Sequence, residues 1–304
     1  MPHLDLIDKK ILAILVGDCR TPYREIAKSL GLSTTAIKSR VDEMVIARVI
    51  TDFIVQFSHA MIDAEDMVVL IKTDGKENRE KFVSEIAANR GVMQICPLYG
   101  EDYFVGAEYT SSLELATLVE AFRSNSHVNN TEIHTLIFPR GKKTNLTNLQ
   151  LKVLKALLED ARMLITDIAK ETGVTVRLVR KILRELKASE AIIFTLRWRL
   201  NVGDRVTFLL KLKWDPKQIS RNEVIDMLLK NYQDKFWEIL PSANEPLLFA
   251  AITVDNLNDV DTITTEIKSL PAIVYSEAII YRPPYNYKSL RRLCLEEAIE
   301  AAGV

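Results

Sequence analysis

Two stretches of thirty residues decide the fold of this chain: LVGDCRTPYREIAKSLGLSTTAIKSRVDEM at 15–44 and LLEDARMLITDIAKETGVTVRLVRKILREL at 157–186. They align without a gap at a constant offset of 142 residues. The identical pairs include Leu15/Leu157, Asp18/Asp160, Arg20/Arg162, Ile26/Ile168, Ala27/Ala169, Lys28/Lys170 and Gly31/Gly173. Self-similarity at a fixed offset indicates a duplicated structural unit, so we interpret the 304 residues as two related halves.

Both stretches carry the signals of three short helices. In the first, Thr21 and Pro22 predict an N-cap and a first helical residue, and Gly31 predicts the end of that helix. Ser33, and Thr175 in the second copy, are suited to cap the third helix. A tight turn between the second and third helices is typical of a helix-turn-helix.

The second copy begins with Thr147-x-x-Gln150, the pattern of a capping box. After the third helix, the segments 47–58 and 190–200 are rich in β-branched and aromatic residues. We therefore expect a two-stranded wing in each copy, which makes each module a winged helix-turn-helix.

After each wing, short apolar strands alternate with amphipathic helices in the order βαββαβ, which is the ferredoxin-like order. The first half has strands at 67–73, 92–98, 103–109 and 132–138 with helices at 77–89 and 113–123; the second has strands at 206–214, 236–241, 247–254 and 273–281 with helices at 222–232 and 260–270. A sheet with helices on one face needs a cover for the other, so we expect the two sheets to meet at a seam.

The expected fold class is α+β, with two winged helix-turn-helix domains alternating with two ferredoxin-like domains. The expected boundaries are 1–60, 61–141, 142–202 and 203–304. An amphipathic helix from Tyr287 to Ala302 either docks on the last of these domains or mediates assembly with another chain.

Composition limits the partners. The formal net charge is −1, so affinity for a nucleic acid must come from a local basic face. The apolar run 11–16 is too short for a membrane span, and no signal peptide is recognised, so a cytoplasmic protein is expected. Cys19, Cys96 and Cys294 are too dispersed for a metal knuckle, which indicates a reducing compartment.

The third helix of each copy is the expected DNA-reading element, because its outer side can face base edges while its inner side packs. In the first copy the expected DNA-binding residues are Thr34, Thr35, Lys38, Ser39 and Arg40. In the second they are Arg177, Arg180, Lys181 and Arg184, with Lys187 on the same face and Leu178, Val179, Ile182, Leu183 and Leu186 on the buried stripe. The second copy is expected to supply more of the non-specific affinity for double-stranded DNA.

This pattern resembles the Lrp/AsnC family of feast/famine regulators, over essentially the whole chain and twice. The residues that carry the resemblance are Leu4, Asp5, Asp8, Ile11, Leu12, Asp18, Arg20, Ile26, Ala27, Gly31, Leu32, Ser33, Val41, Val49 and Ile50. The segment Tyr99-Gly100-Glu101-Asp102 resembles the family's effector-binding turn. The resemblance implies a sequence-specific transcription regulator that responds to an amino acid or related metabolite and works as a homodimer of two pseudo-dimeric chains.

Two departures suggest that the halves have specialised. The loop equivalent to the effector turn is Ser242-Ala243-Asn244-Glu245, which lacks the glycine and the aspartate. Ile182 stands where the first copy has Arg40. A plain hairpin turn remains an alternative for Gly100 and Asp102.

Two other functions stay open. One is an architectural DNA-binding protein without effector control. The other is an enzyme similar to the siroheme decarboxylases, in which this fold holds a tetrapyrrole and histidines act in catalysis. The four histidines, His3, His59, His127 and His134, show no pair at a fixed spacing, so we expect no enzyme activity, catalytic residue, metal or cofactor.

Overall fold

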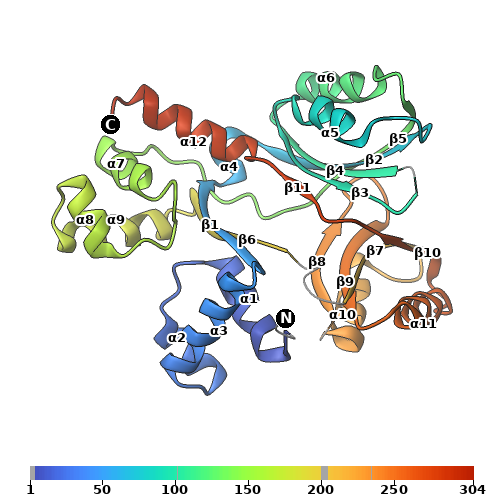
Figure 1. The fold of residues 1–304 in the computed structure, drawn as a ribbon, viewed down its shortest axis with the longest axis horizontal. Helices are drawn as coiled ribbons and strands as arrows, with labels where there is room; N and C mark the ends of the chain where they lie inside the picture. The colour runs from blue at the N-terminus through green and yellow to red at the C-terminus, as the bar shows by residue number, and fades with distance from the viewer. Residues whose placement is uncertain (1–3, 101, 200–204, 234) are drawn as a thin grey trace. The chain divides into compact units, whose positions relative to one another are not determined.

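The computed structural model describes residues 4–100, 102–199, 205–233 and 235–304. Helices and strands are segregated into helix-turn-helix modules and open sheets, which confirms the α+β class (Figure 1). The chain divides into two compact units. Unit 1 comprises 1–64, 139–203 and 291–304, and unit 2 comprises 65–138 and 204–290. No helix among the described residues combines the length and the apolar character that a membrane span requires.

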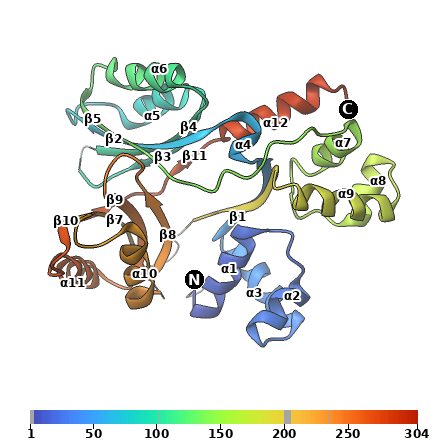
Figure 2. The ribbon, with the colours of Figure 1, turned by 180° about the vertical axis from the view of Figure 1, so that it is seen from behind.

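Unit 1 contains two modules of three helices each, seen on either side of β1 in Figure 2. The helices are α1 (Leu6–Gly17), α2 (Tyr23–Leu30) and α3 (Thr34–Ile46) in the first module, and α7 (Asn148–Ala156), α8 (Ile165–Thr172) and α9 (Val176–Ala188) in the second. The caps are mostly as expected: the Ser33 side chain accepts from the Ala36 amide, that of Thr175 accepts from the Leu178 amide, and the Thr147 capping box is present. The start of α2 differs, because Pro22 itself is the N-cap residue and provides no side-chain hydrogen bond.

The wings differ from the expected pair of two-stranded wings. Each module supplies one strand, β1 (Ile50–Phe57) or β6 (Ile192–Trp198), and the two strands pair antiparallel with each other. Phe53 lies opposite Leu196, and Val55 lies opposite Phe194. The modules therefore share one two-stranded sheet, which joins them through backbone hydrogen bonds.

The C-terminal helix α12 (Leu290–Ala301) also differs from the expectation that it docks on the last ferredoxin-like domain. Its buried Leu295 and Ile299 belong to the core of unit 1, together with residues of α7, α9 and both wing strands. The Arg292 guanidinium donates to the carbonyl oxygens of Val55 (2.9 Å) and Leu158 (2.5 Å). The end of the chain thus stabilises the second helix-turn-helix module.

A short helix, α4 (His59–Ile62), follows β1.

Unit 2 contains the two βαββαβ motifs, which confirms that element order in both halves. The first motif consists of β2 (Glu65–Thr73), α5 (Arg79–Ala87), β3 (Val92–Pro97), β4 (Asp102–Tyr109), α6 (Ser112–Arg123) and β5 (Val128–Thr135); the second consists of β7 (Val206–Trp214), α10 (Arg221–Tyr232), β8 (Phe236–Pro241), β9 (Leu247–Val254), α11 (Leu257–Lys268) and β10 (Ile273–Ile280). Each sheet packs its own pair of helices around a separate apolar core (Figure 1).

The other faces of the two sheets meet within unit 2. Phe104 of β4 and Phe249 of β9 are in edge-to-face contact, with ring centroids 5.8 Å apart, inside a cluster drawn from both sheets. A short strand, β11 (Tyr285–Asn286), crosses from the second motif and extends the first sheet to the order β11-β3-β4-β2-β5. The second sheet has the order β10-β7-β9-β8.

Two equivalent seams flank this cluster. At seam 1, the Tyr99 amide donates to the Ile280 carbonyl (3.0 Å) and the Arg282 amide donates to the Pro97 carbonyl (2.8 Å). At seam 2, the Ala243 amide donates to the Thr135 carbonyl (2.7 Å) and the Ile137 amide donates to the Pro241 carbonyl (3.0 Å). The matching hydrogen bonds make Ala243 of seam 2 the counterpart of Tyr99 in seam 1. Ile137 of seam 2 is likewise the counterpart of Arg282.

Candidate nucleic-acid interface and effector seam

The outer face of α3 presents short polar side chains. Thr34, Thr35, Lys38 and Ser39 are all exposed. The Ser39 hydroxyl donates to the Glu43 carboxylate one turn later (2.9 Å), which ties it to an acidic group. Thr35 and Lys38 thus combine exposure with side chains that can donate to base edges.

Arg40 does not belong to this exposed set. Its guanidinium is half-buried and donates to the carboxylates of Asp5 (2.9 Å) and Asp8 (2.8 Å) at the start of α1. Burial opposes ionisation of Asp5, yet hydrogen bonds from the Asp8 amide and from Arg40 hold the pKa of that carboxyl below its usual range. Arg40 therefore fastens α3 to α1, whereas its equivalent Ile182 is buried in an apolar core that includes residues of α7.

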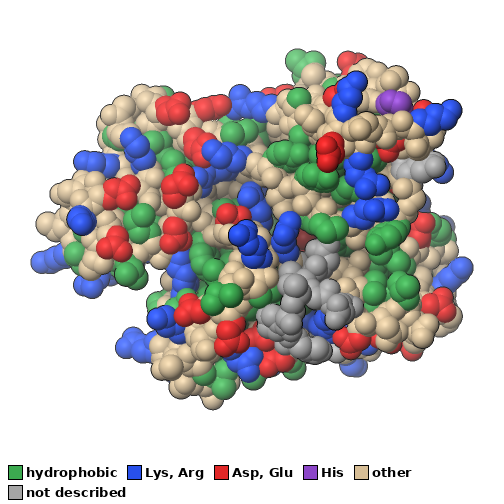
Figure 3. All heavy atoms as spheres, in the orientation of Figure 1, with side chains coloured by type: hydrophobic (Ala, Val, Ile, Leu, Met, Phe, Trp, Pro, Cys, Tyr) green, Lys and Arg blue, Asp and Glu red, His purple; other side chains and the backbone are tan. Residues whose placement is uncertain are grey.

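The outer face of α9 is basic. Arg177, Arg180, Lys181 and Arg184 are exposed, and Figure 3 shows basic side chains at the margin beside α8 and α9. Lys181 pairs only loosely with Glu185, at 3.6 Å, and Arg184 Nε lies 3.4 Å from the Arg180 carbonyl. The face can therefore present several cations to phosphate groups.

Two residues of α9 are placed differently from the expectation. Leu178, expected on the buried stripe, has 36% of its surface exposed and adjoins the basic side chains in sequence. Lys187, expected to face DNA, pairs with Asp18 of the other module at 2.5 Å. The buried stripe of α9 is thus narrower than expected. The basic surface of the helix ends at Arg184, one turn before Lys187.

The two modules hold each other through equivalent arginines. Arg20 donates to the carbonyl oxygens of Ala161 (2.5 Å) and Met163 (3.1 Å). Arg162 donates to those of Cys19 and Thr21 (3.2 Å to the latter). Because the acceptors obey the same offset of 142 as the arginines, the contacts are related by the internal twofold of unit 1. Burial of the site raises the pKa of Cys19 to about 12, so this thiol packs as a neutral group.

Seam 1 contains most of the expected effector turn. Tyr99 is 66% exposed, and Gly100 has φ +112 with open space where a side chain would lie. Asp102 opens β4 opposite Lys72, and Glu101 lies outside the described residues. The Arg282 guanidinium stacks on the Tyr99 ring, 4.7 Å from its centroid. Arg282 comes from the second half of the chain, and the sequence comparison missed it because its partner lies far away in sequence.

Side chains of the protein form a hydrogen-bonded network at seam 2. Lys211 donates to both oxygens of Glu132 (2.6 Å each), and the same carboxylate lies 2.8 Å from Nε2 of the buried His134. The Ser242 hydroxyl lies 3.5 Å from Nδ1 of that histidine. Burial opposes ionisation of Glu132, but the hydrogen bonds from Lys211 and His134 prevail and lower its pKa.

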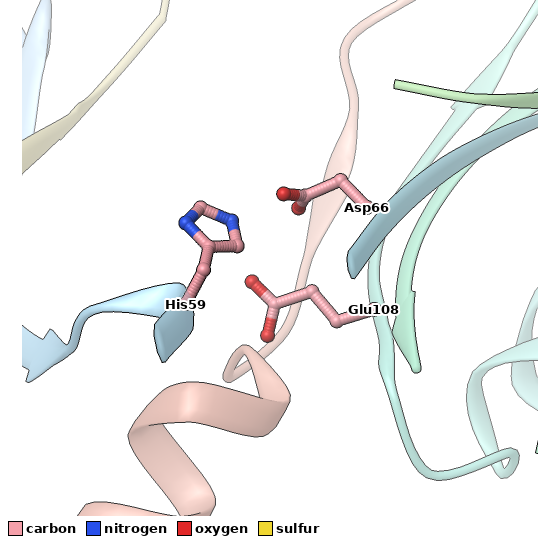
Figure 4. Close-up of side chains that lie close together, drawn as sticks. All are labelled: His59, Asp66 and Glu108. Carbon is pink, nitrogen blue, oxygen red and sulfur yellow. The ribbon is translucent and has the colours of Figure 1, made fainter. Parts of the chain in front are cut away.

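Two buried carboxylates were not singled out from the sequence. Asp66 of β2 and Glu108 of β4 lie directly opposite each other in the register, and Figure 4 shows both side chains. Only Glu108 departs from an apolar stretch in the sequence, near the end of β4, because Asp66 follows Glu65 at the start of β2. By themselves, two carboxylates provide fewer ligands than a divalent cation takes. His59, also drawn in Figure 4, begins α4 in unit 1.

Comparison with known proteins identifies both helix-turn-helix modules. Residues 4–45 match the AsnC-type helix-turn-helix domain, and residues 146–193 match a winged helix-turn-helix DNA-binding domain. A helix-turn-helix transcription regulator of Pyrococcus horikoshii (PH1692) is 32% identical over 137 residues, which are 44% of this chain and 92% of that protein. The regulator AldR of Mycobacterium tuberculosis is 27% identical over 142 residues, 45% of this chain and 78% of AldR. Such relatives correspond to one half of the duplicated chain.

A solved structure matches the whole chain. The siroheme decarboxylase NirDL covers 98% of this chain and 100% of its own, with a TM-score of 0.58 and 13% sequence identity. The expectation that the protein is not an enzyme is therefore not supported, because the same full-length arrangement of elements occurs in an enzyme. At this identity the likeness shows the shared fold.

Proposed function

Because the chain belongs to the Lrp/AsnC family of DNA-binding transcription regulators, we propose that its two helix-turn-helix modules act as a built-in pair on two adjacent DNA half-sites. The observation that carries the proposal is the reciprocal contact of Arg20 and Arg162, which joins the two modules within one chain. In family members built from one such half, a second chain must supply the second module.

The two reading helices have different tasks in this proposal. Helix α9, through Arg177, Arg180, Lys181 and Arg184, contributes contacts to phosphate. Helix α3, through Thr35 and Lys38, contributes discrimination between bases, while Asp42 and Glu43 limit its attraction to the backbone. Unequal helices favour an asymmetric operator, whereas identical ones favour a palindrome.

Regulation by a small molecule is the second part of the proposal. The effector, an amino acid or related metabolite, binds at seam 1 beside Tyr99, Gly100 and Asp102. Seam 2 takes none, because Lys211, Glu132 and His134 already satisfy one another there. The chain therefore binds one effector molecule. In this proposal two chains also associate as a homodimer, which contains four DNA-binding modules.

Selection of binding sites from random duplex DNA tests the DNA-binding part. We expect wild-type protein to enrich one asymmetric sequence, and the Thr35→Ala/Lys38→Ala variant to lose preference in one half of it. The matched control is Thr166→Ala on α8, outside either reading helix. Absence of any enriched sequence for the wild type would instead indicate an architectural DNA-binding protein.

A further inference from the structure

The guanidinium of Arg282 is incompletely satisfied. Its Nε atom is buried and has no hydrogen-bond partner among the described residues, although the Arg282 amide is bonded to Pro97. No carboxylate of the described residues forms an ion pair with it. A buried donor of a charged group that lacks an acceptor is costly, so its presence needs an explanation, and a ligand that completes the hydrogen bond is one.

The surroundings of Arg282 hold it ready for a ligand. The Tyr99 ring lies under the guanidinium and fixes its plane by a cation–π contact. Gly100, next in the chain, leaves open space beside its backbone, and its φ of +112 is one that side-chain-bearing residues rarely adopt. An arginine fixed in this way presents its N–H groups as a fork, the geometry that matches a planar oxyanion.

We infer that seam 1 binds its effector by a carboxylate group, which Arg282 receives in a bidentate pair above Tyr99. This inference rests on the proposed effector response and adds its chemistry. A single arginine, with the acidic Asp102 at the start of β4 just after the turn, suits a monoanion, whereas a phosphate dianion needs more positive charge than one guanidinium provides.

The equivalent position in seam 2 supports a dedicated role. Ile137 and Ala243 stand there in place of Arg282 and Tyr99, with the same backbone hydrogen bonds. The backbone of the seam therefore forms without the arginine and the tyrosine. Their side chains are dispensable for the architecture, so a function other than holding the two sheets together explains them.

The test measures binding of each of the twenty L-amino acids to the full chain by isothermal titration calorimetry in the absence of DNA. We expect at least one of them to bind at one molecule per chain, and its carboxamide derivative to bind about tenfold more weakly or worse, because a hydrogen-bonded charge is lost. Arg282→Gln should weaken binding of the amino acid to the same extent, and Arg282→Lys, which keeps the charge without the fork, should restore only part of it.

The matched control is Ile137→Gln, which should leave the affinity unchanged. Unchanged melting temperatures of the variants establish that they fold. Equal affinity of wild type and Arg282→Gln would overturn the role of Arg282 and leave an effector site standing. Tighter binding of inorganic phosphate than of every amino acid would overturn the carboxylate assignment. Absence of binding by all twenty amino acids would remove both the effector proposal and this inference, while DNA binding, measured separately, stands independently.

Discussion

Arg20 and Arg162 exchange equivalent contacts across unit 1: each guanidinium donates to two backbone carbonyls of the other module, and the four acceptors are Ala161, Met163, Cys19 and Thr21. Arginine suits this place because its planar fork reaches two acceptors at once. Together with the pairing of β1 and β6, the exchange makes one chain equivalent to a dimer of helix-turn-helix modules.

Loss of either arginine should destabilise unit 1. We expect Arg20→Ala to lower the free energy of unfolding by about 2–3 kcal/mol, because two charge-assisted hydrogen bonds are lost and two carbonyls remain unsatisfied. Arg162→Ala should lower the free energy of unfolding by slightly more than Arg20→Ala does, because Arg162 also stacks on Tyr23. Its guanidinium lies 4.2 Å from the centroid of that ring. Urea unfolding measures both losses; a negligible effect of both variants would contradict the interlock.

Substitution of Arg40 should affect stability, whereas substitution of the arginines of α9 should affect the salt dependence of DNA binding. Arg180→Ala/Arg184→Ala should reduce the slope of log affinity against log salt by up to about two, if both side chains meet phosphate. Arg40→Gln should leave that slope unchanged and instead lower stability by about 1 kcal/mol, because it breaks the contacts to Asp5 and Asp8. Fluorescence anisotropy of labelled duplex DNA over a salt series distinguishes the two classes.

The ion pair of seam 2 should be sensitive to acid. Since the pKa of Glu132 is lower in the folded chain than its ordinary value of 4.5, its ionised form stabilises the fold above that value. This stability is lost as the pH falls through the lowered pKa. We expect Glu132→Gln to melt below the wild type at pH 7, and the difference to shrink below pH 4.5. A difference that stays constant with pH would show that Glu132 acts by packing.

Helix α12 should be necessary for the stability of unit 1. Leu295→Ala removes a fully buried side chain from the core shared with α7 and α9, and we expect a loss of about 2–4 kcal/mol. Glu300→Ala on the exposed side of the same helix is the control and should change stability little. Light scattering of Leu295→Ala addresses the alternative role: conversion of an oligomer to single chains without a change in melting temperature would assign α12 to assembly.

Local signals were enough for much of this fold. The offset of 142 revealed the duplication, glycine and serine marked the helix ends, and alternating strands and helices gave both βαββαβ motifs. Long-range pairing was not predictable in the same way. Strand propensity indicates that 50–57 is a strand, but the choice of β6 as its partner depends on how two distant modules pack.

The candidate site also combines features that local sequence predicts with contacts between residues distant in sequence, which it does not predict. The exposed face of α9 follows from helical spacing, because i, i+3 and i+4 share a side. The pairing of Arg40 with Asp5 and Asp8, and the stacking of Arg282 on Tyr99, join residues that are distant in sequence. A basic residue on a helix is therefore expected to be exposed, but contacts with residues distant in sequence can partly bury its side chain, as they do for Arg40.

Hydroxyl-radical footprinting on the selected DNA sequence, at saturating protein, tests the built-in pair most directly. We predict two protected tracts per chain, with centres separated by about one helical turn of 10–10.5 base pairs or a multiple of it. Arg180→Ala/Arg184→Ala should weaken protection of the DNA backbone in one tract and spare the other. A single protected tract for the wild type, or equal loss from both tracts in the variant, would contradict the claim that the two modules of one chain hold two half-sites.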